Sequence, residues 1–382
     1  MTAATIERAL QDKPWTAKEI AQQPETLLQT LALIKQEKNS IEGFLEPLLS
    51  QKDCRIILTG AGTSSFIGDC LAPWLNARLD CRVESVATTD IVAAPEIYLE
   101  KDTPTLLVSF GRSGNSPESV AAADLADKYV SDCSQLAITC NGDGALVKRI
   151  CKNDRGYAVL LPEATHDRGF AMTSSFTSMM LAALVIFSDI DGFDDRVPAI
   201  SKSITASLKL AEAPTGSLAR AGFERAVFLG SHIFMGLSHE ASLKLLELTD
   251  GELVALHDSP LGFRHGPKTI MNPKTLMIVM MSNDELARKY ETDLVEELKA
   301  DPRMGHLLLL DTKAGENTDR VTHITIPDMN AAEDADLLFP YIAVAQSLAL
   351  EFSMAMGMTP DQPSRFGNVN RVVQGVKIHE PA

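Results

Sequence analysis

A strand-like run, a turn rich in serine and glycine, and the start of a helix follow one another between residues 105 and 129. The apolar run 105–108 predicts a buried strand, and Pro117 followed by Ala and Leu at helical spacing predicts a helix. The turn between them directs free backbone N–H groups and the positive end of a helix dipole at one spot. It therefore predicts an anion site, most naturally for a phosphate, and its residues are Ser113, Gly114, Asn115 and Ser116.

A second turn of the same kind ends the apolar run 55–60 and contains Gly62, Thr63 and Ser64. Further strands are expected at 83–87, 105–110, 135–139 and 158–161. Because helices fall between most of these strands, the pattern predicts an α/β fold with a parallel sheet covered on both faces. Ligands of such sheets bind beyond the carboxyl ends of the strands, so the two turns could face one ligand. In a simpler interpretation, which stays open, each turn only caps its helix.

The pattern restarts after residues 188–222, which we interpret as the connection between two domains, with a helix at about 200–211. The run 225–230 resembles 55–60, which indicates a weak duplication. Later strands are expected at 275–281, 306–310 and 323–326, and later helices at 234–249, 284–298 and 334–356. In the second copy, residues 279–284 replace the turn rich in serine and glycine, so we expect phosphate to bind only to the first copy.

The length of 382 residues also favours two domains over a single hydrophobic core. We expect an N-terminal helical segment at 1–45 and a first domain, with the phosphate site, at 46–195. A second domain, with the residues that carry the chemistry, is expected at 196–360, and a C-terminal tail at 361–382.

Composition argues against several classes of partner. The net charge of −16 argues against nucleic acid, and an anionic substrate must be held by local groups. No uninterrupted apolar run could span a membrane, and residues 1–20 lack the pattern of a signal peptide. The six cysteines are scattered, which indicates reduced thiols in a cytoplasmic protein. No cluster of residues has the spacing of a metal site, and the dinucleotide motif that begins at Gly60 is incomplete, so we expect no cofactor.

Glu240, Lys244 and Glu247 lie at positions i, i+4 and i+7 of the helix expected at 234–249, so they share one face. A solvated stripe with an ion pair is one interpretation of this spacing. The other depends on the loop 262–268, in which glycine and proline fix the surroundings of His265. A carboxylate, an ammonium group and an imidazole together can relay protons between carbon and oxygen, which favours an enzyme.

Two sets of residues resemble those of known proteins. The first set resembles tandem sugar-isomerase (SIS) domains, as in the isomerase half of glucosamine-6-phosphate synthase, and comprises 60–64, 113–116, Glu240, Lys244, Glu247 and 264–267. The second resembles the galactosamine-6-phosphate deaminase/isomerase family, also called tagatose-6-phosphate ketose/aldose isomerases, and comprises 110–119, 165–175 and 370–376. The resemblance covers about residue 40 to the end and implies two SIS domains, each a flavodoxin-like three-layer α/β/α fold.

The resemblance implies which residues bind the substrate, a small-molecule sugar phosphate. The phosphate would be held by Gly62, Thr63, Ser64, Arg112, Ser113, Gly114, Asn115 and Ser116. Thr173, Ser174 and Gln374 would belong to the substrate pocket. The synthase has a lysine where Ser174 stands and another where Gln374 best aligns, so contacts there are expected to differ from those of the synthase.

The resemblance also implies which residues carry the chemistry. Glu247 would move a proton between C1 and C2 of the opened sugar, and Lys244 would serve the oxygens. Glu240 is the next candidate for the base. His265 would help to open the sugar ring. In the synthase this histidine comes from the neighbouring subunit, which implies a homodimer with shared sites.

The direction of the reaction follows from the lack of a glutaminase. The synthase obtains ammonia from an N-terminal glutaminase with a cysteine nucleophile, whereas here the first cysteine is Cys54 and too few residues precede the first domain. We therefore expect deamination, with D-galactosamine 6-phosphate and water giving D-tagatose 6-phosphate and ammonia. The alternatives are an aldose–ketose isomerase that handles no nitrogen and a regulator that only senses sugar phosphates.

Overall fold

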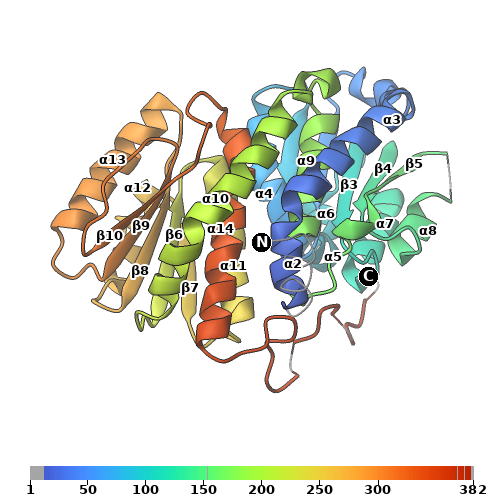
Figure 1. Ribbon diagram of the computed structural model, residues 1–382. Coiled ribbons are helices and arrows are strands. Elements are labelled where there is room, and N and C mark those ends of the chain that lie inside the picture. Colours follow the sequence, from blue (N-terminus) through green and yellow to red (C-terminus); the bar gives the residue numbers. More distant parts are fainter. Residues whose placement is uncertain (1–12, 153, 368, 374, 380–382) are drawn as a thin grey trace, which may run out of the picture. The chain divides into compact units, whose positions relative to one another are not determined.

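The computed structural model describes residues 13–152, 154–367, 369–373 and 375–379, and Figure 1 labels its elements. The described chain forms two compact units, and each contains one β-sheet. The first-sheet unit comprises residues 26–166, 175–197 and the described residues after 368. The second-sheet unit comprises residues 13–25, 167–174 and 198–367.

The first sheet has five parallel strands in the order β2-β1-β3-β4-β5. Its strands are β1 (Arg55–Thr59), β2 (Arg82–Ser85), β3 (Thr105–Gly111), β4 (Cys133–Thr139) and β5 (Gly156–Leu160). The helices that lie mostly in this unit are α3 (Gln23–Leu49), α4 (Thr63–Asn76), α5 (Thr88–Ala93), α6 (Pro95–Tyr98), α7 (Pro117–Tyr129), α8 (Ala145–Ile150) and α9 (Ser174–Ile186), with the 3-10 helices η1 (Glu163–Thr165) and η2 (Ile190–Phe193). Buried aliphatic side chains join α5 and α7 to one face of the sheet, where Ile57 and Leu107 pack against Leu125.

The second sheet repeats this topology, with five parallel strands in the order β10-β9-β8-β6-β7. Its strands are β6 (Arg225–Gly230), β7 (Val254–Asp258), β8 (Thr275–Met280), β9 (His306–Asp311) and β10 (Val321–Thr325). Its unit contains the helices α2 (Trp15–Ala21), α10 (Arg196–Ala219), α11 (Ile233–Leu248), α12 (Pro260–Phe263), α13 (Glu285–Ala300) and α14 (Asp334–Ala355), and the 3-10 helix η3 (Pro267–Ile270). In both sheets the first strand of the copy lies between its second and third strands, which confirms the predicted duplication and the α/β fold.

Two elements of the second copy differ from expectation. The strand β7 has no counterpart among the predicted strands, because it is an edge strand whose Val254 and Leu256 stay exposed and whose run is short. The helix expected at about 200–211, within the predicted connection 188–222, is present but longer than expected: α10 has 24 residues and continues through Pro214.

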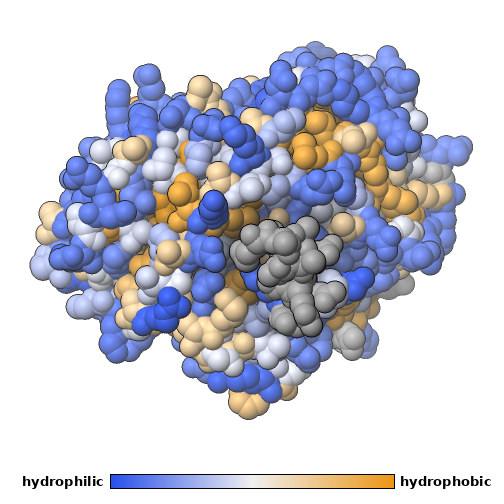
Figure 2. All heavy atoms as spheres, viewed as in Figure 1, coloured by the Kyte–Doolittle hydropathy of each residue, from blue (hydrophilic) through white to orange (hydrophobic). Residues whose placement is uncertain are grey.

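The longest apolar helix is a core element. By length and composition α14 is the single described helix that could cross a membrane, and 83% of its most apolar stretch is buried within the protein. That degree of burial is typical of the central helix of a folded domain. On the face shown in Figure 2 the surface is mostly hydrophilic, and hydrophobic residues are exposed in small groups.

Candidate functional site

The two turns rich in serine and glycine follow neighbouring strands of the first sheet. Strand β1 pairs with β3, and Thr59 lies opposite Ser109 in the register. The chain leaves β1 toward β2 on one side and leaves β3 toward β4 on the other, so the ends of these two strands form the topological switch point. The structure therefore brings the two turns to the edge of the sheet where ligands of this fold bind.

The first turn is held close to its own helix. A Cβ atom at Gly60 would lie 2.5 Å from the backbone carbon of Ser64, so only glycine fits there. The hydroxyl of Ser65 donates to the carbonyl oxygen of Gly62 at 2.8 Å. Thr63 and Ser64 are buried in the first turn of α4, where the N–H groups of Ser64 and Ser65 donate to the carbonyl oxygens of Ala61 and Gly62 at 3.3 Å and 2.8 Å. This geometry suits the binding of an anion at the start of α4.

The second turn is fixed by amide and hydroxyl contacts. Gly114 has a φ of +61°, a conformation that favours glycine. Asn115 Oδ1 accepts from the N–H of Ala145 at 2.9 Å, and Asn141 Nδ2 donates to the carbonyl of Ser113 at 2.8 Å. The side chain of Ser116 caps no N–H of α7, and its hydroxyl donates to Glu118 at 2.6 Å. The turn is therefore a rigid part of the sheet edge.

Arg112 follows directly after β3 and is buried. Its Nη2 atom donates to the carbonyl oxygen of Arg371 at 2.9 Å, so part of the C-terminal tail lies beside this turn. Gln374, the tail residue expected at the substrate pocket, lies outside the described residues.

The helix α11 carries Glu240, Lys244 and Glu247 on one face. Lys244 is 1% exposed and Glu240 is 0% exposed, and their charged atoms lie 3.5 Å apart. Lys244 also forms a closer ion pair with Glu247, whose side chain is 24% exposed. The interpretation as a solvated stripe is therefore wrong for Glu240 and Lys244. Burying charges is costly, so a buried lysine between two carboxylates is a candidate for a functional group.

His265 lies on the other face of the second sheet from α11. Phe263 of α12 packs with Val279 and the other side chains on one face of the strands. On α11, by contrast, Ser238 contacts Met280, which is the next residue along β8. Because successive side chains of a strand point to opposite faces, α11 and α12 lie on opposite faces of the sheet. The structure therefore does not bring the exposed His265 to Glu247 within one chain.

Thr173 and Ser174 lie in a segment of the second-sheet unit that Asp167 organises. The buried carboxylate of Asp167 accepts from the N–H of Thr173 at 2.8 Å and from the hydroxyl of Ser174. Gln22 Nε2 donates to the oxygen of Ser174 at 2.9 Å. Both predicted pocket residues are thus buried and held by neighbouring polar groups.

Glu19 is a buried acid in this region that the sequence analysis missed. Its carboxylate accepts from the N–H groups of Arg168 and Gly169 at 2.5 Å and 3.2 Å. Burial, and next the neighbouring Asp167, raise the pKa of Glu19 to about 7. No pattern within α2 indicates this contact, because its partners are about 150 residues away along the chain.

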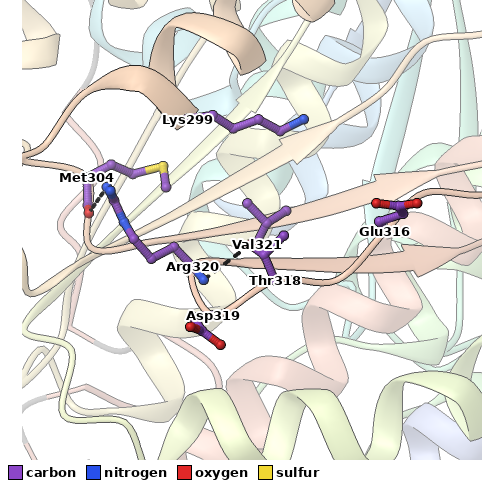
Figure 3. Close-up of a pocket in the computed structure, with 7 residues that line it drawn as sticks. All are labelled: Lys299, Met304, Glu316, Thr318, Asp319, Arg320 and Val321. Carbon is purple, nitrogen blue, oxygen red and sulfur yellow. Dashed lines mark hydrogen bonds between the residues drawn. The ribbon is translucent and has the colours of Figure 1, made fainter.

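Other polar features are less suited to chemistry. In the part of the chain that the structure describes, no three His, Cys, Asp or Glu side chains gather as around a metal ion. A cavity of about 600 Å³ lies at the amino ends of β9 and β10 (Figure 3). Within it, Arg320 donates to the carbonyl oxygens of Asp301 and Met304, and Lys299 pairs with Glu296. The two basic side chains of this cavity are thus engaged with the protein itself.

The repeated parallel sheets, with turns rich in serine and glycine at the switch point of the first, fit a protein built from SIS domains, and the SIS domain family matches residues 48–188. The chain belongs to the family of D-galactosamine-6-phosphate deaminases known as AgaS. It is 43% identical over 369 residues to D-galactosamine-6-phosphate deaminase AgaS of Escherichia coli, which covers 96% of this chain and 95% of that protein.

Solved structures agree with this assignment. The crystal structure of tagatose-6-phosphate ketose/aldose isomerase from Escherichia coli is 40% identical, with a TM-score of 0.89, and the match covers 100% of this chain and 98% of that one. The C-terminal domain of glucosamine-fructose-6-phosphate aminotransferase from Francisella tularensis has a TM-score of 0.75 at 22% identity, over 92% of this chain and 98% of that one. The latter likeness concerns the fold alone.

Proposed function

We propose that the chain converts D-galactosamine 6-phosphate and water into D-tagatose 6-phosphate and ammonia. The observation that carries the proposal is the buried Lys244, which lies between Glu240 and Glu247 on α11. The names of relatives in the deaminase family support the substrate. A cytoplasmic location and the domain limits at residues 45, 195 and 360 stay predictions that belong to this proposal.

In the proposed reaction the turns of the first-sheet unit hold the phosphate group. Backbone N–H groups at the start of α4, together with Thr63, Ser64 and Ser113, supply donors to an anion, and Arg112 supplies charge. Ser116 would have to exchange its hydrogen bond with Glu118 for one with the phosphate. These contacts are the same in the ground state and the transition state, so they serve binding and not the chemical step.

Glu247 acts as the base in this proposal. It removes the C2 proton of the open-chain amino sugar and returns a proton to C1, while O1 gains a proton and the amino group loses one, which gives a C1 hydroxyl and an imine at C2. Water adds to C2, the C–N bond breaks, and ammonia leaves as the C2 carbonyl of the ketose forms. The ammonium group of Lys244 stabilises negative charge that develops on the substrate oxygens. Glu247 is suited to its part because its side chain is partly exposed, whereas Glu240 is fully buried.

We assign ring opening to His265 of the partner subunit in a homodimer. The support is topological: the exposed His265 and the face of α11 are separated by the sheet within one chain. A histidine in this position can serve a second chain more readily than its own.

Glu247→Gln tests the assignment of the base. The substitution is nearly isosteric, so the variant should fold and bind, while the rate of ammonia release falls by roughly 10²–10⁴-fold. In deuterated water the wild type should place deuterium at C1 of the ketose phosphate, because a carboxylate exchanges its proton with solvent. If ammonia release stays within about tenfold of the wild-type rate, Glu247 is not the base.

A mixing experiment tests the shared site. Glu247→Gln chains and His265→Ala chains are each expected to be inactive, but exchange of subunits would create one intact site in a mixed dimer. Activity should therefore return on mixing. Subunit exchange shown by mass, without any return of activity, would mean that His265 acts within its own chain.

The name of the Escherichia coli isomerase supports a second candidate, a ketose–aldose isomerisation without deamination. Incubation with galactosamine 6-phosphate, glucosamine 6-phosphate and tagatose 6-phosphate, scored for both ammonia and sugar phosphates, separates the two. Formation of an aldose phosphate from tagatose 6-phosphate, with no ammonia from either amino sugar, would overturn the deaminase proposal.

A further inference from the structure

The second sheet has a switch point of its own, between β6 and β8, in the place that corresponds to β1 and β3 of the first sheet. His232 lies in the turn after β6 with a φ of +40°, and α11 begins at the next residue. Ser282 and Asn283 lie in the turn after β8, just before α13. In a fold of this type such a crevice receives a ligand.

Three different donors meet at this second switch point. The hydroxyl of Ser282 donates to Asp334 Oδ2 at 2.5 Å, and the backbone N–H of Asn283 donates to Asp334 Oδ1 at 2.7 Å. His232 Nε2 lies 2.9 Å from Asp334 Oδ2. A hydroxyl, a backbone N–H and an imidazole are groups that bind carboxylates and phosphates, and here they surround a carboxylate of the chain itself.

The segment that precedes Asp334 in the chain is also held in place. Asn283 Nδ2 donates to the carbonyl oxygens of Met329 and Ala332, both at 2.9 Å. The side chain of Asp334 is 9% exposed, and α14 begins at this residue. A second carboxylate binds the same turn, because Glu291 accepts from the N–H of Ser282 at 2.7 Å.

We propose that the second-sheet unit retains an anion-binding site for a carboxylate or small oxyanion, and that Asp334 fills it as an internal ligand. In the proposed function the corresponding turns of the first-sheet unit bind the substrate phosphate, whereas the second-sheet unit uses its donors to hold the start of α14. Each chain therefore has one site for a substrate anion and not two. The comparison with the first-sheet unit rests on the proposed function, whereas the occupation of the second switch point by Asp334 rests on the contacts of Ser282, Asn283 and His232 alone.

Removing the internal ligand should open the site to a free anion. Asp334→Ala leaves the donors of Ser282 and Asn283 without their acceptor, so the thermal midpoint should fall by roughly 5–10 °C. Sodium formate or acetate should then raise the midpoint in a saturable way and recover about half of the loss, as expected for a ligand that binds only the folded state. The wild type should show no saturable effect.

Asp284→Ala is the matched control. Asp284 also accepts backbone N–H groups at the start of a helix, at 3.0 Å and 2.8 Å, but it is exposed to water. Its loss should lower the midpoint without any gain from formate. An equal formate effect in Asp284→Ala and Asp334→Ala would overturn the proposal.

Asp334→Asn separates charge from shape. The amide fills the same space, so the variant should lose stability and gain nothing from formate. If Asp334→Asn is as stable as the wild type, the site does not require an anion and the proposal fails. Should Asp334→Ala not fold alone, refolding with formate should recover folded protein. No recovery with formate would likewise overturn the proposal.

Discussion

The carboxylate of Glu19 is a buried acid whose ionisation should loosen the segment 167–174. Burial, and next the carboxylate of Asp167, raise the pKa of Glu19 from its ordinary value of 4.5 to about 7. The N–H groups of Arg168 and Gly169 lower it, and Asp361 raises it further. Between about pH 4.5 and pH 7 the folded chain therefore keeps a proton on Glu19 that the unfolded chain has already released.

The sign and size of the effect follow from this difference. The contribution of Glu19 to the free energy of unfolding is fully present below about pH 4.5 and falls as the pH rises. It levels off above about pH 7, with a total loss of about 3 kcal/mol. Between about pH 6 and pH 8 the loss is about 1.4 kcal/mol, so local opening of this region should become about tenfold more frequent.

Hydrogen exchange of residues 167–174 measures this opening directly. The wild type should show the tenfold increase after correction for intrinsic exchange, whereas Glu19→Gln, which cannot ionise, should open equally at both pH values. Glu285→Gln, which removes an exposed acid of the same unit, should keep the wild-type behaviour. If Glu19→Gln shows the same increase as the wild type, another group titrates and the assignment to Glu19 is wrong.

Two further substitutions test the groups assigned to the reaction. Lys244→Met removes the cation between Glu240 and Glu247, so it should abolish ammonia release and destabilise the fold by about 3–5 kcal/mol, read as a lower thermal midpoint. An unchanged midpoint would show that the buried carboxylate does not depend on this cation. Replacing Ser113 and Ser116 with alanine should raise KM far more than it lowers kcat, and a fall in kcat at constant KM would contradict their role in phosphate binding.

Much of the fold could be predicted because its signals are local. The runs 55–60 and 225–230 end in a glycine that the following helix requires, since a Cβ atom at Gly60 or Gly230 would lie 2.5 Å from that helix. The exposed edge strand β7 lacks such a signal, so it was missed. The spacing of Glu240 and Lys244 showed that they share a face, but not that the face is buried, because burial depends on elements distant in sequence.

The position of His265 illustrates a different limit. Its place in the sequence, 18 residues after Glu247, suggests proximity within one chain. The strand order separates the two residues, because the chain passes from β6 to β7 and then back past β6 to β8. Right-handed connections in opposite directions put the two crossovers on opposite faces of the sheet. Strand order is not visible in a single sequence, so this separation emerged only from the structure.

The helix α11 shows how the second copy differs from the first. At its N-terminus His232 is engaged with Asp334, and this end of the helix is therefore closed to a ligand. The rise of a helix puts Glu247 about 20 Å away, near the opposite end. A carboxylate there faces the negative end of the helix dipole, which is unfavourable without a nearby cation, and Lys244 supplies that cation. The proposed chemistry of the second copy thus lies at the amino ends of the strands of its sheet. The two turns of the first copy that are rich in serine and glycine lie instead at the carboxyl ends of the strands of theirs.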